Sequence, residues 1–222
     1  MVDHLPDNCP FCGAGSKNFI TAEECSRRYK VVGTPVNERV TLLNSSPSFG
    51  LEHAAYKVET GEGVLMIDCP STFDPTIPPL DHIIFTHHHF LGASNLYRSE
   101  FGAKVQIHRL DSDNELTRGF IFDDLFERGF MEIGLEAYPI DGHTPGFTFY
   151  LFEDVLFICD YIFMKKGRVS KFNRFGPAEK TAAGGQRLLD LLSRRTISTV
   201  CGYNYVTDFP EWVNGVEGLL GL

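Results

Sequence analysis

The sequence predicts an α/β fold, a layered β-sheet with helices on its outside. Three observations favour this class. The first strands follow one another as hairpins, the later strands alternate with helices, and polar residues stand directly after several strand ends. The chain has 222 residues, 43% hydrophobic and 22% charged. That length and composition can build one domain with a substantial core.

In the first half of the chain, the pattern of polar and apolar residues changes near Arg39. The first 30 or so residues are polar, contain cysteines and show no periodicity. After Arg39, short apolar runs separated by turn residues predict strands, and glycine is expected to end the helices. Asp111 is the expected N-cap of the second helix. We expect strands at 40–43, 54–60, 64–67, 82–85 and 104–107, and helices at 92–101 and 111–118.

The second half continues the alternation. A moderately charged loop is expected at 165–177, followed by a helix whose apolar face is formed by leucines between Leu188 and Leu192. We expect strands at 133–140, 147–152, 155–159 and 197–201, and a final helix at 209–220.

Histidines and aspartates follow the predicted strands at the positions where ligand sites form on such sheets. Three consecutive histidines, His87 to His89, come after one apolar run, and another histidine lies in a glycine-flanked turn. Imidazole is the commonest transition-metal ligand. Three histidines and a carboxylate suit zinc or iron. The strand-end residues are Asp68, His87, His89, His143 and Asp160.

Four motifs in order resemble the metallo-β-lactamase fold superfamily. The run from Thr86 to Gly92 resembles the family's T-H-x-H-x-D-H, and Gly142-His143-Thr144-Pro145-Gly146 matches its G-H-T-P-G turn. Asp160 matches its bridging aspartate, and Asp68-Cys69-Pro70 resembles its early aspartate step. The resemblance implies a four-layer αββα sandwich over residues 39–222, with residues 1–38 as a cysteine-bearing extension.

Departures from the family pattern affect the second of its two metal sites. The motif's aspartate falls on Leu91 and its following histidine on Gly92, while the family's last histidine falls on Tyr203. The resemblance therefore implies one ion, zinc or iron, held by His87, His89, His143 and Asp160. A gapped alignment instead places His89 on the missing histidine.

Three functions follow from this reduced site. The first is a mononuclear metallohydrolase acting on a small ester, thioester or lactone, with Asp68 and Asp160 as catalytic carboxylates. A single zinc ion can still lower the pKa of water to about 7. The second is a mononuclear iron oxidoreductase or dioxygenase, because His87, His143 and Asp160 resemble the ligand set of the persulfide-dioxygenase branch. The third is a non-catalytic relic domain that binds metal or a partner.

The six cysteines are expected to be thiols or metal ligands. Cys9 and Cys12, in a Cys-x-x-Cys-Gly sequence, have the form of a metal knuckle that Cys25 and His4 complete. Free thiols and a redox pair remain alternatives for that pair. Three further cysteines next to the metal-site loops are either buried small residues or thiols that line the pocket: Cys69, Cys159 and Cys201.

The net charge of −9 argues against a nucleic-acid partner. No apolar run approaches the roughly 20 residues that span a bilayer, and the N-terminus has no secretory-signal pattern. We therefore expect a cytoplasmic protein with a small-molecule substrate and no membrane partner. The phenylalanines between Phe120 and Phe130 are core residues, a substrate mouth or the face of a homodimer.

Overall fold

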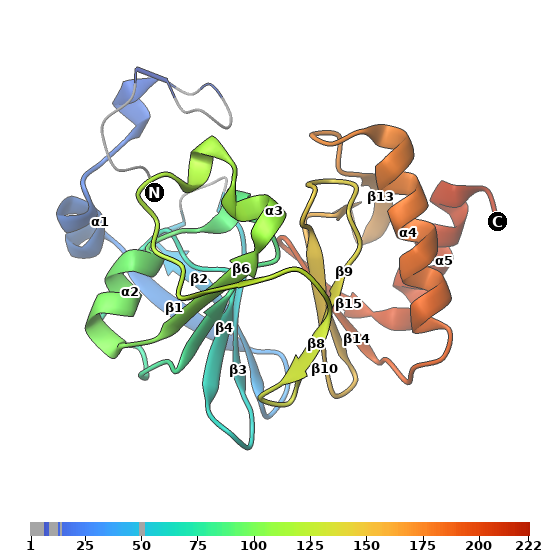
Figure 1. Cartoon of the computed structure of the whole chain (residues 1–222), viewed down its shortest axis with the longest axis horizontal. Helices are drawn as coiled ribbons and strands as arrows, with labels where there is room; N and C mark the ends of the chain where they lie inside the picture. Colours follow the sequence, from blue (N-terminus) through green and yellow to red (C-terminus); the bar gives the residue numbers. More distant parts are fainter. Residues whose placement is uncertain (1–6, 9–12, 14, 49–51) are drawn as a thin grey trace. The chain divides into compact units, whose positions relative to one another are not determined.

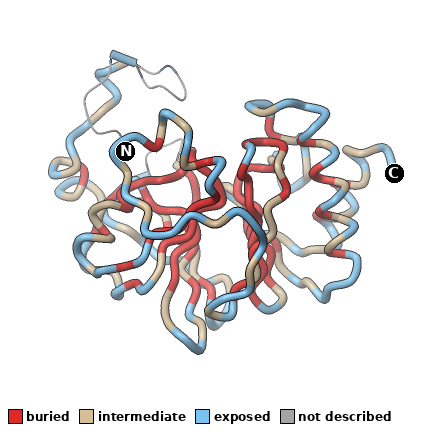
Figure 2. The backbone as a smooth tube through the Cα atoms, in the orientation of Figure 1, coloured by how far each residue is buried: buried red, intermediate tan, exposed pale blue. Residues whose placement is uncertain are grey.

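A computed structural model describes residues 7–8, 13, 15–48 and 52–222 (Figure 1). The chain divides into two compact units, Met1–Leu125 and Phe126–Leu222. Each unit contains one large sheet, and the buried residues concentrate in the central strands of each sheet (Figure 2). None of the helices in these described ranges is long and apolar enough to cross a membrane.

The first unit is built on a seven-stranded sheet in the order β1-β2-β3-β4-β5-β6-β7. Strands β1 to β4 are antiparallel neighbours, whereas β4, β5 and β6 pair in parallel. Its elements are η1 Ser16–Asn18, α1 Ala22–Arg28, β1 Lys30–Pro35, β2 Val40–Ser46, β3 Ala55–Glu59, β4 Val64–Ile67, β5 His82–Ile84, η2 His88–Phe90, α2 Ser94–Phe101, β6 Lys104–His108, α3 Arg109–Ser112, η3 Glu115–Thr117 and β7 Asp124–Phe126.

The second unit is built on a six-stranded sheet in the order β15-β14-β11-β10-β9-β8, with a separate β12-β13 hairpin. Strands β10 and β11 are buried along their full length, as their continuous apolar runs predict. Its elements are β8 Phe130–Glu132, β9 Leu135–Pro139, β10 Thr148–Phe152, β11 Val155–Cys159, β12 Ile162–Lys165, β13 Arg168–Phe172, α4 Ala178–Leu192, β14 Thr199–Gly202, β15 Val206–Asp208 and α5 Phe209–Leu220.

Three expectations about elements are wrong. The helix expected at 111–118 is a short α3 followed by η3, and the N-cap of α3 is His108, whose Nδ1 accepts a hydrogen bond from Leu110 N. Asp111 therefore lies inside the helix. The loop expected at 165–177 contains β13.

Strand β1 lies within the predicted extension, residues 1–38, yet it pairs with β2 over six residues. The boundary at residue 39 stays a prediction.

Candidate metal centre

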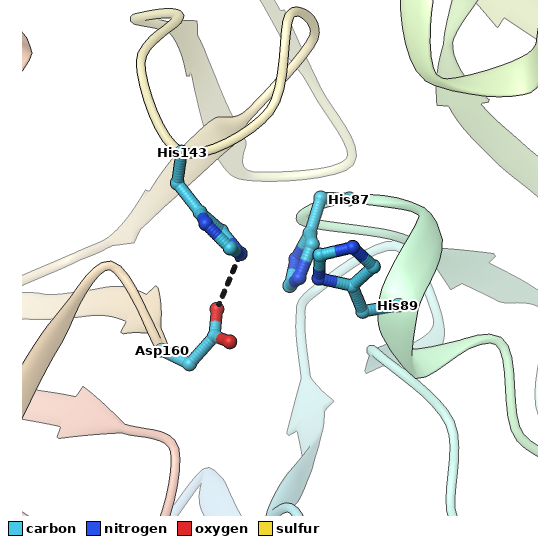
Figure 3. Close-up of side chains that lie close together, drawn as sticks. All are labelled: His87, His89, His143 and Asp160. Atoms are coloured by element: carbon cyan, nitrogen blue, oxygen red, sulfur yellow. Dashed lines mark ion pairs between the residues drawn. The ribbon is translucent and has the colours of Figure 1, made fainter. Parts of the chain in front are cut away.

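His87 and His89 leave the sheet of the first unit at the end of β5. That strand pairs with β4 and β6, so its end is fixed by a strand on each side. His87 is buried and His89 is half-buried, and their ring centroids are 4.6 Å apart (Figure 3). Two imidazoles therefore lie close together after this strand, and their role as metal ligands stays a prediction.

A chain of hydrogen bonds orients His87. Thr86 donates its backbone N–H and its hydroxyl to the Asp68 carboxylate, each at 2.9 Å. The same hydroxyl oxygen lies 3.0 Å from His87 Nδ1. Since Thr86 has one hydroxyl hydrogen and gives it to Asp68, the imidazole donates Nδ1–H to Thr86. In this tautomer Nε2 carries the lone pair that would bind a metal ion, as in metal-binding histidines generally.

Asp68 was predicted as a catalytic carboxylate. It is 2% exposed, has a positive φ of 56° and hydrogen-bonds to Thr86 through both carboxylate oxygens. Those contacts suit a residue that orients His87. Its catalytic role stays a prediction.

The resemblance places ligands of the second metal site at positions 91 and 92. In this chain these positions hold a leucine in the apolar core and a glycine that packs closely against backbone atoms. Leu91 is 3% exposed and belongs to the apolar core of the first unit together with Cys69 and Leu80. Gly92 has a φ of +51°, and a Cβ built there would lie 2.1 Å from Cys69 O and 2.4 Å from Pro70 O. No side chain fits at position 92, so no histidine ligand can stand there without moving the backbone after β4.

His53, which the sequence did not single out, supports the same loop. Its Nε2 lies 2.8 Å from Cys69 O, and its ring stacks on Phe90 with centroids 4.1 Å apart. Burial lowers the pKa of His53 to about 4, so the ring is neutral at pH 7. A neutral His53 donates Nε2–H to Cys69 O and holds Phe90 beside the histidine run.

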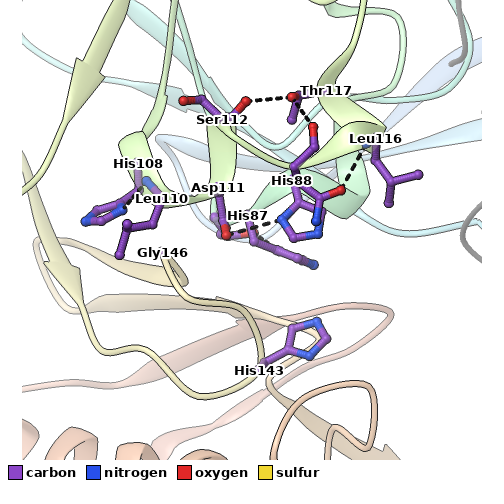
Figure 4. Close-up of polar contacts among 12 residues, drawn as sticks. His87, His88, His108, Leu110, Asp111, Ser112, Leu116, Thr117, His143 and Gly146 are labelled. Carbon is purple, nitrogen blue, oxygen red and sulfur yellow. Dashed lines mark hydrogen bonds and ion pairs between the residues drawn. The ribbon is translucent and has the colours of Figure 1, made fainter.

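His88, the middle histidine, is directed at a buried aspartate. Its Nδ1 lies 3.2 Å from Asp111 Oδ1, and the two side chains are 5% and 0% exposed (Figure 4). Asp111 belongs to α3, and η3 follows α3 in the chain. The Thr117 hydroxyl in η3 hydrogen-bonds to Ser112 O and Asn114 O and so stabilises the connection between them. The pair ties η2, which carries His88 and His89, to α3.

In the second unit, His143 and Asp160 face each other. His143 lies in the turn between β9 and β10, and Asp160 follows β11. His143 Nε2 is 3.4 Å from Asp160 Oδ1, and both residues are buried (Figure 3). Two ligands that each lie about 2.1 Å from a tetrahedral ion are about 3.4 Å apart. This pair of donors therefore fits a shared zinc or iron ion.

The turn that carries His143 depends on glycine. A Cβ at Gly142 would lie 2.4 Å from the Tyr161 hydroxyl, which is within hydrogen-bond distance of the carbonyls of Asp141 and Thr181. Gly142 also has a φ of +113°, which L side chains rarely adopt. The buried tyrosine thus joins the turn to α4.

Asn173 is the residue at this centre that sequence reasoning missed. It is 2% exposed, and its Nδ2 donates to Asp160 Oδ2 at 2.8 Å and lies 3.2 Å from His143 Nε2. Nothing near it in the sequence forms a metal-binding motif, because its contacts are with residues 13 and 30 positions away.

The remaining predicted site residues are described in part. Cys69 is fully buried in the apolar core, where burial raises its pKa. Cys25 is buried, with its Sγ 3.7 Å from Thr72 Oγ1, and burial raises its pKa too. Cys9, Cys12 and His4 lie outside the described residues, so the knuckle stays a prediction.

The other two candidate pocket cysteines, Cys159 and Cys201, are also buried. Tyr203, at the position of the family's last histidine, packs edge-on against Phe163 at 5.9 Å between centroids.

Comparison with known proteins gives one curated relative and many structural ones. No family profile matches the chain. A hydroxyacylglutathione hydrolase of Shewanella pealeana is 32% identical over 185 residues, which cover 80% of this chain and 66% of that protein. The chain thus spans slightly less than two thirds of the relative's length.

Solved structures share the fold. A metallo-β-lactamase from Pontibacter korlensis matches with a TM-score of 0.67 at 17% identity, covering 86% of this chain and 99% of its own. TTHA1623 in a di-iron-bound form matches with a TM-score of 0.58 at 23% identity, covering 76% of this chain and 93% of its own. The predicted fold class, α/β of this type, is confirmed.

Proposed function

The chain has the metallo-β-lactamase fold and is similar to a hydroxyacylglutathione hydrolase, and from this premise we propose that it is a metal-dependent hydrolase with a one-ion centre. The ligands that we propose are the four residues named by the sequence motifs, His87, His89, His143 and Asp160. The substrate is a small ester, thioester or lactone. The acidic chain, with its net charge of −9, suits neither a nucleic-acid nor a membrane partner.

The observation that carries the proposal is the buried His143–Asp160 pair at 3.4 Å, a separation that suits two ligands of one ion. The oriented tautomer of His87 adds a third donor of the same kind. The hydrolase relative, at 32% identity, favours hydrolysis as the reaction. The blocked position at Gly92 and the buried Leu91 favour a single ion.

The ion, when bound, supplies Lewis acidity and lowers the pKa of a water molecule. The protein's own groups hold the site: the Asp68–Thr86 link fixes the ring of His87, and the His88–Asp111 pair fixes the turn that carries His89. Because Leu91 replaces the family's motif aspartate, no carboxylate from that position takes a proton from the attacking water.

The test combines metal content with turnover. Protein purified without chelator is expected to contain about one equivalent of zinc or iron and to hydrolyse members of a panel of esters, thioesters and lactones. His143→Ala is expected to lose both. His82→Gln, at the start of β5 and outside the ligand set, is the matched control and is expected to keep both. If His143→Ala keeps its metal and its turnover, the ligand assignment is wrong.

An iron oxidoreductase is the alternative, because the structural relative TTHA1623 has a di-iron-bound form and His87, His143 and Asp160 make a two-histidine, one-carboxylate set. Coloured protein with oxygen-dependent turnover favours this function over hydrolysis. Metal binding with neither hydrolysis of the substrate panel nor oxygen-dependent turnover favours the relic domain.

A further inference from the structure

The carboxylate of Asp160 has its two oxygens in different surroundings, and Asn173 makes the difference. Oδ1 faces His143 Nε2 at 3.4 Å, whereas Oδ2 accepts a hydrogen bond from Asn173 Nδ2 at 2.8 Å. The same amide nitrogen lies 3.0 Å from the backbone carbonyl of Asp160. One side chain therefore holds both the backbone and one carboxylate oxygen of Asp160.

The orientation of the Asn173 amide is fixed by its own neighbours. Its Oδ1 accepts the backbone N–H of Phe175 at 2.9 Å, so the NH₂ group must face Asp160. Its backbone N–H donates to Tyr161 O at 2.9 Å. With 2% exposure and both ends of the amide bonded, this side chain has no room to rotate away.

The loop that carries Asn173 also packs against His143. A Cβ at Gly176 would lie 2.4 Å from His143 O and 2.7 Å from His143 Cα. The segment from Asn173 to Gly176 therefore contacts both proposed ligand residues of the second unit: the Asn173 side chain reaches Asp160 and His143, and the backbone at Gly176 packs closely against His143.

We propose that Asn173 is a positioning residue that makes Asp160 a one-oxygen metal ligand, with Oδ1 directed at the ion and Oδ2 held back. This inference rests on the proposed metal site and deepens it. A carboxylate that binds a single ion through both oxygens must direct both of them at the ion. The hydrogen bond from Asn173 to Oδ2 opposes that arrangement and leaves Oδ1 as the oxygen directed at the ion.

The test measures the metal, not the turnover. Zinc affinity is measured by competition with a chelator, and the visible absorption of the cobalt-substituted protein reports coordination number. Asn173→Ala is expected to weaken zinc binding about 10- to 100-fold, as loss of a ligand's hydrogen-bond partner does in other metal sites. Its cobalt absorption is expected to become weaker, because Oδ2 is free to join the coordination sphere.

Two further variants make the result decisive. Asn173→Asp keeps the shape and the acceptor for Phe175 N but cannot donate to Oδ2, so its cobalt spectrum is also expected to change, and it decides the test if Asn173→Ala does not fold. Phe175→Ala is the matched control in the same loop: its side chain is 68% exposed, and its backbone N–H remains. The control is expected to keep the wild-type affinity and spectrum.

The outcomes separate this inference from the proposed function. If folded Asn173 variants have the wild-type zinc affinity and cobalt spectrum while His143→Ala binds no metal, the positioning role is wrong and the metal site stands. If the wild-type protein binds no metal, or His143→Ala binds it normally, both are wrong. A spectral change in both Asn173 variants, absent from Phe175→Ala, supports the positioning role.

Discussion

Replacement of Gly92 tests whether a side chain at position 92, a ligand position of the family's second metal site, is sterically blocked. A Cβ there meets Cys69 O at 2.1 Å, and the φ of +51° is already unfavourable for L residues. Gly92→Ala is expected to lower the free energy of unfolding by about 3 kcal/mol, measured by denaturant titration. Gly61→Ala is the control, because a Cβ at that position would meet no atom within 4 Å. A Gly92→Ala protein as stable as Gly61→Ala contradicts the steric argument.

His53 gives the protein a pH-dependent stability. Its pKa falls from 6.5 to about 4 on folding because burial disfavours the charged ring. The unfolded chain therefore binds a proton on this histidine between about pH 6.5 and pH 4, while the folded protein does not. The stability from a neutral His53 is complete above pH 6.5 and decreases as the pH falls toward 4.

The expected loss over this window is about 3 kcal/mol, from the linkage of roughly 1.4 kcal/mol per pKa unit. His53→Gln removes the titrating ring, so its stability is expected to fall less between pH 6.5 and pH 4 than that of the wild type. Denaturant titrations across the range measure the two slopes. Parallel slopes would show that other groups account for the pH dependence.

At the scale of elements, the His88–Asp111 contact joins η2 to α3. Its two side chains are 5% and 0% exposed, so removal of Asp111 deprives the buried His88 ring of this contact. Asp111→Ala is expected to cost about 3 kcal/mol of unfolding free energy. A double-mutant cycle with His88→Ala is expected to give a coupling of about 1–3 kcal/mol. Asp113→Ala, exposed at the end of α3, is the control, and additive single effects would contradict the contact.

Elements that the sequence predicted well are those whose pattern is local. β4, β11 and α5 lie at the expected residues, because continuous apolar runs or a clear helical pattern define them between turn residues. β13 was missed because its burial is low and its sequence, Arg168–Phe172, carries two charged residues. α3 departed from expectation because His108 caps it in place of Asp111.

The candidate site divides in the same way. His87, His89, His143 and Asp160 follow strand ends and match motifs, so sequence could name them. Asn173 could not be named, because its role arises from a turn 30 residues away and a strand end 13 residues away that folding brings to it. The block at Gly92 was equally hidden: the sequence shows a missing histidine, but only the backbone of Cys69 and Pro70 shows that none fits.

For the whole molecule, the proposed metal site makes stability depend on the ion, because the ion binds the folded chain and not the unfolded one. Binding to the folded chain alone stabilises it by about 2.7 kcal/mol when free metal is at 100 times its dissociation constant. We expect zinc to raise the midpoint of thermal unfolding and a chelator to lower it. His143→Ala is expected to show no zinc-dependent shift, whereas His82→Gln shifts as the wild type does. A zinc shift of equal size in His143→Ala would mean that the stabilising ion binds elsewhere in the chain.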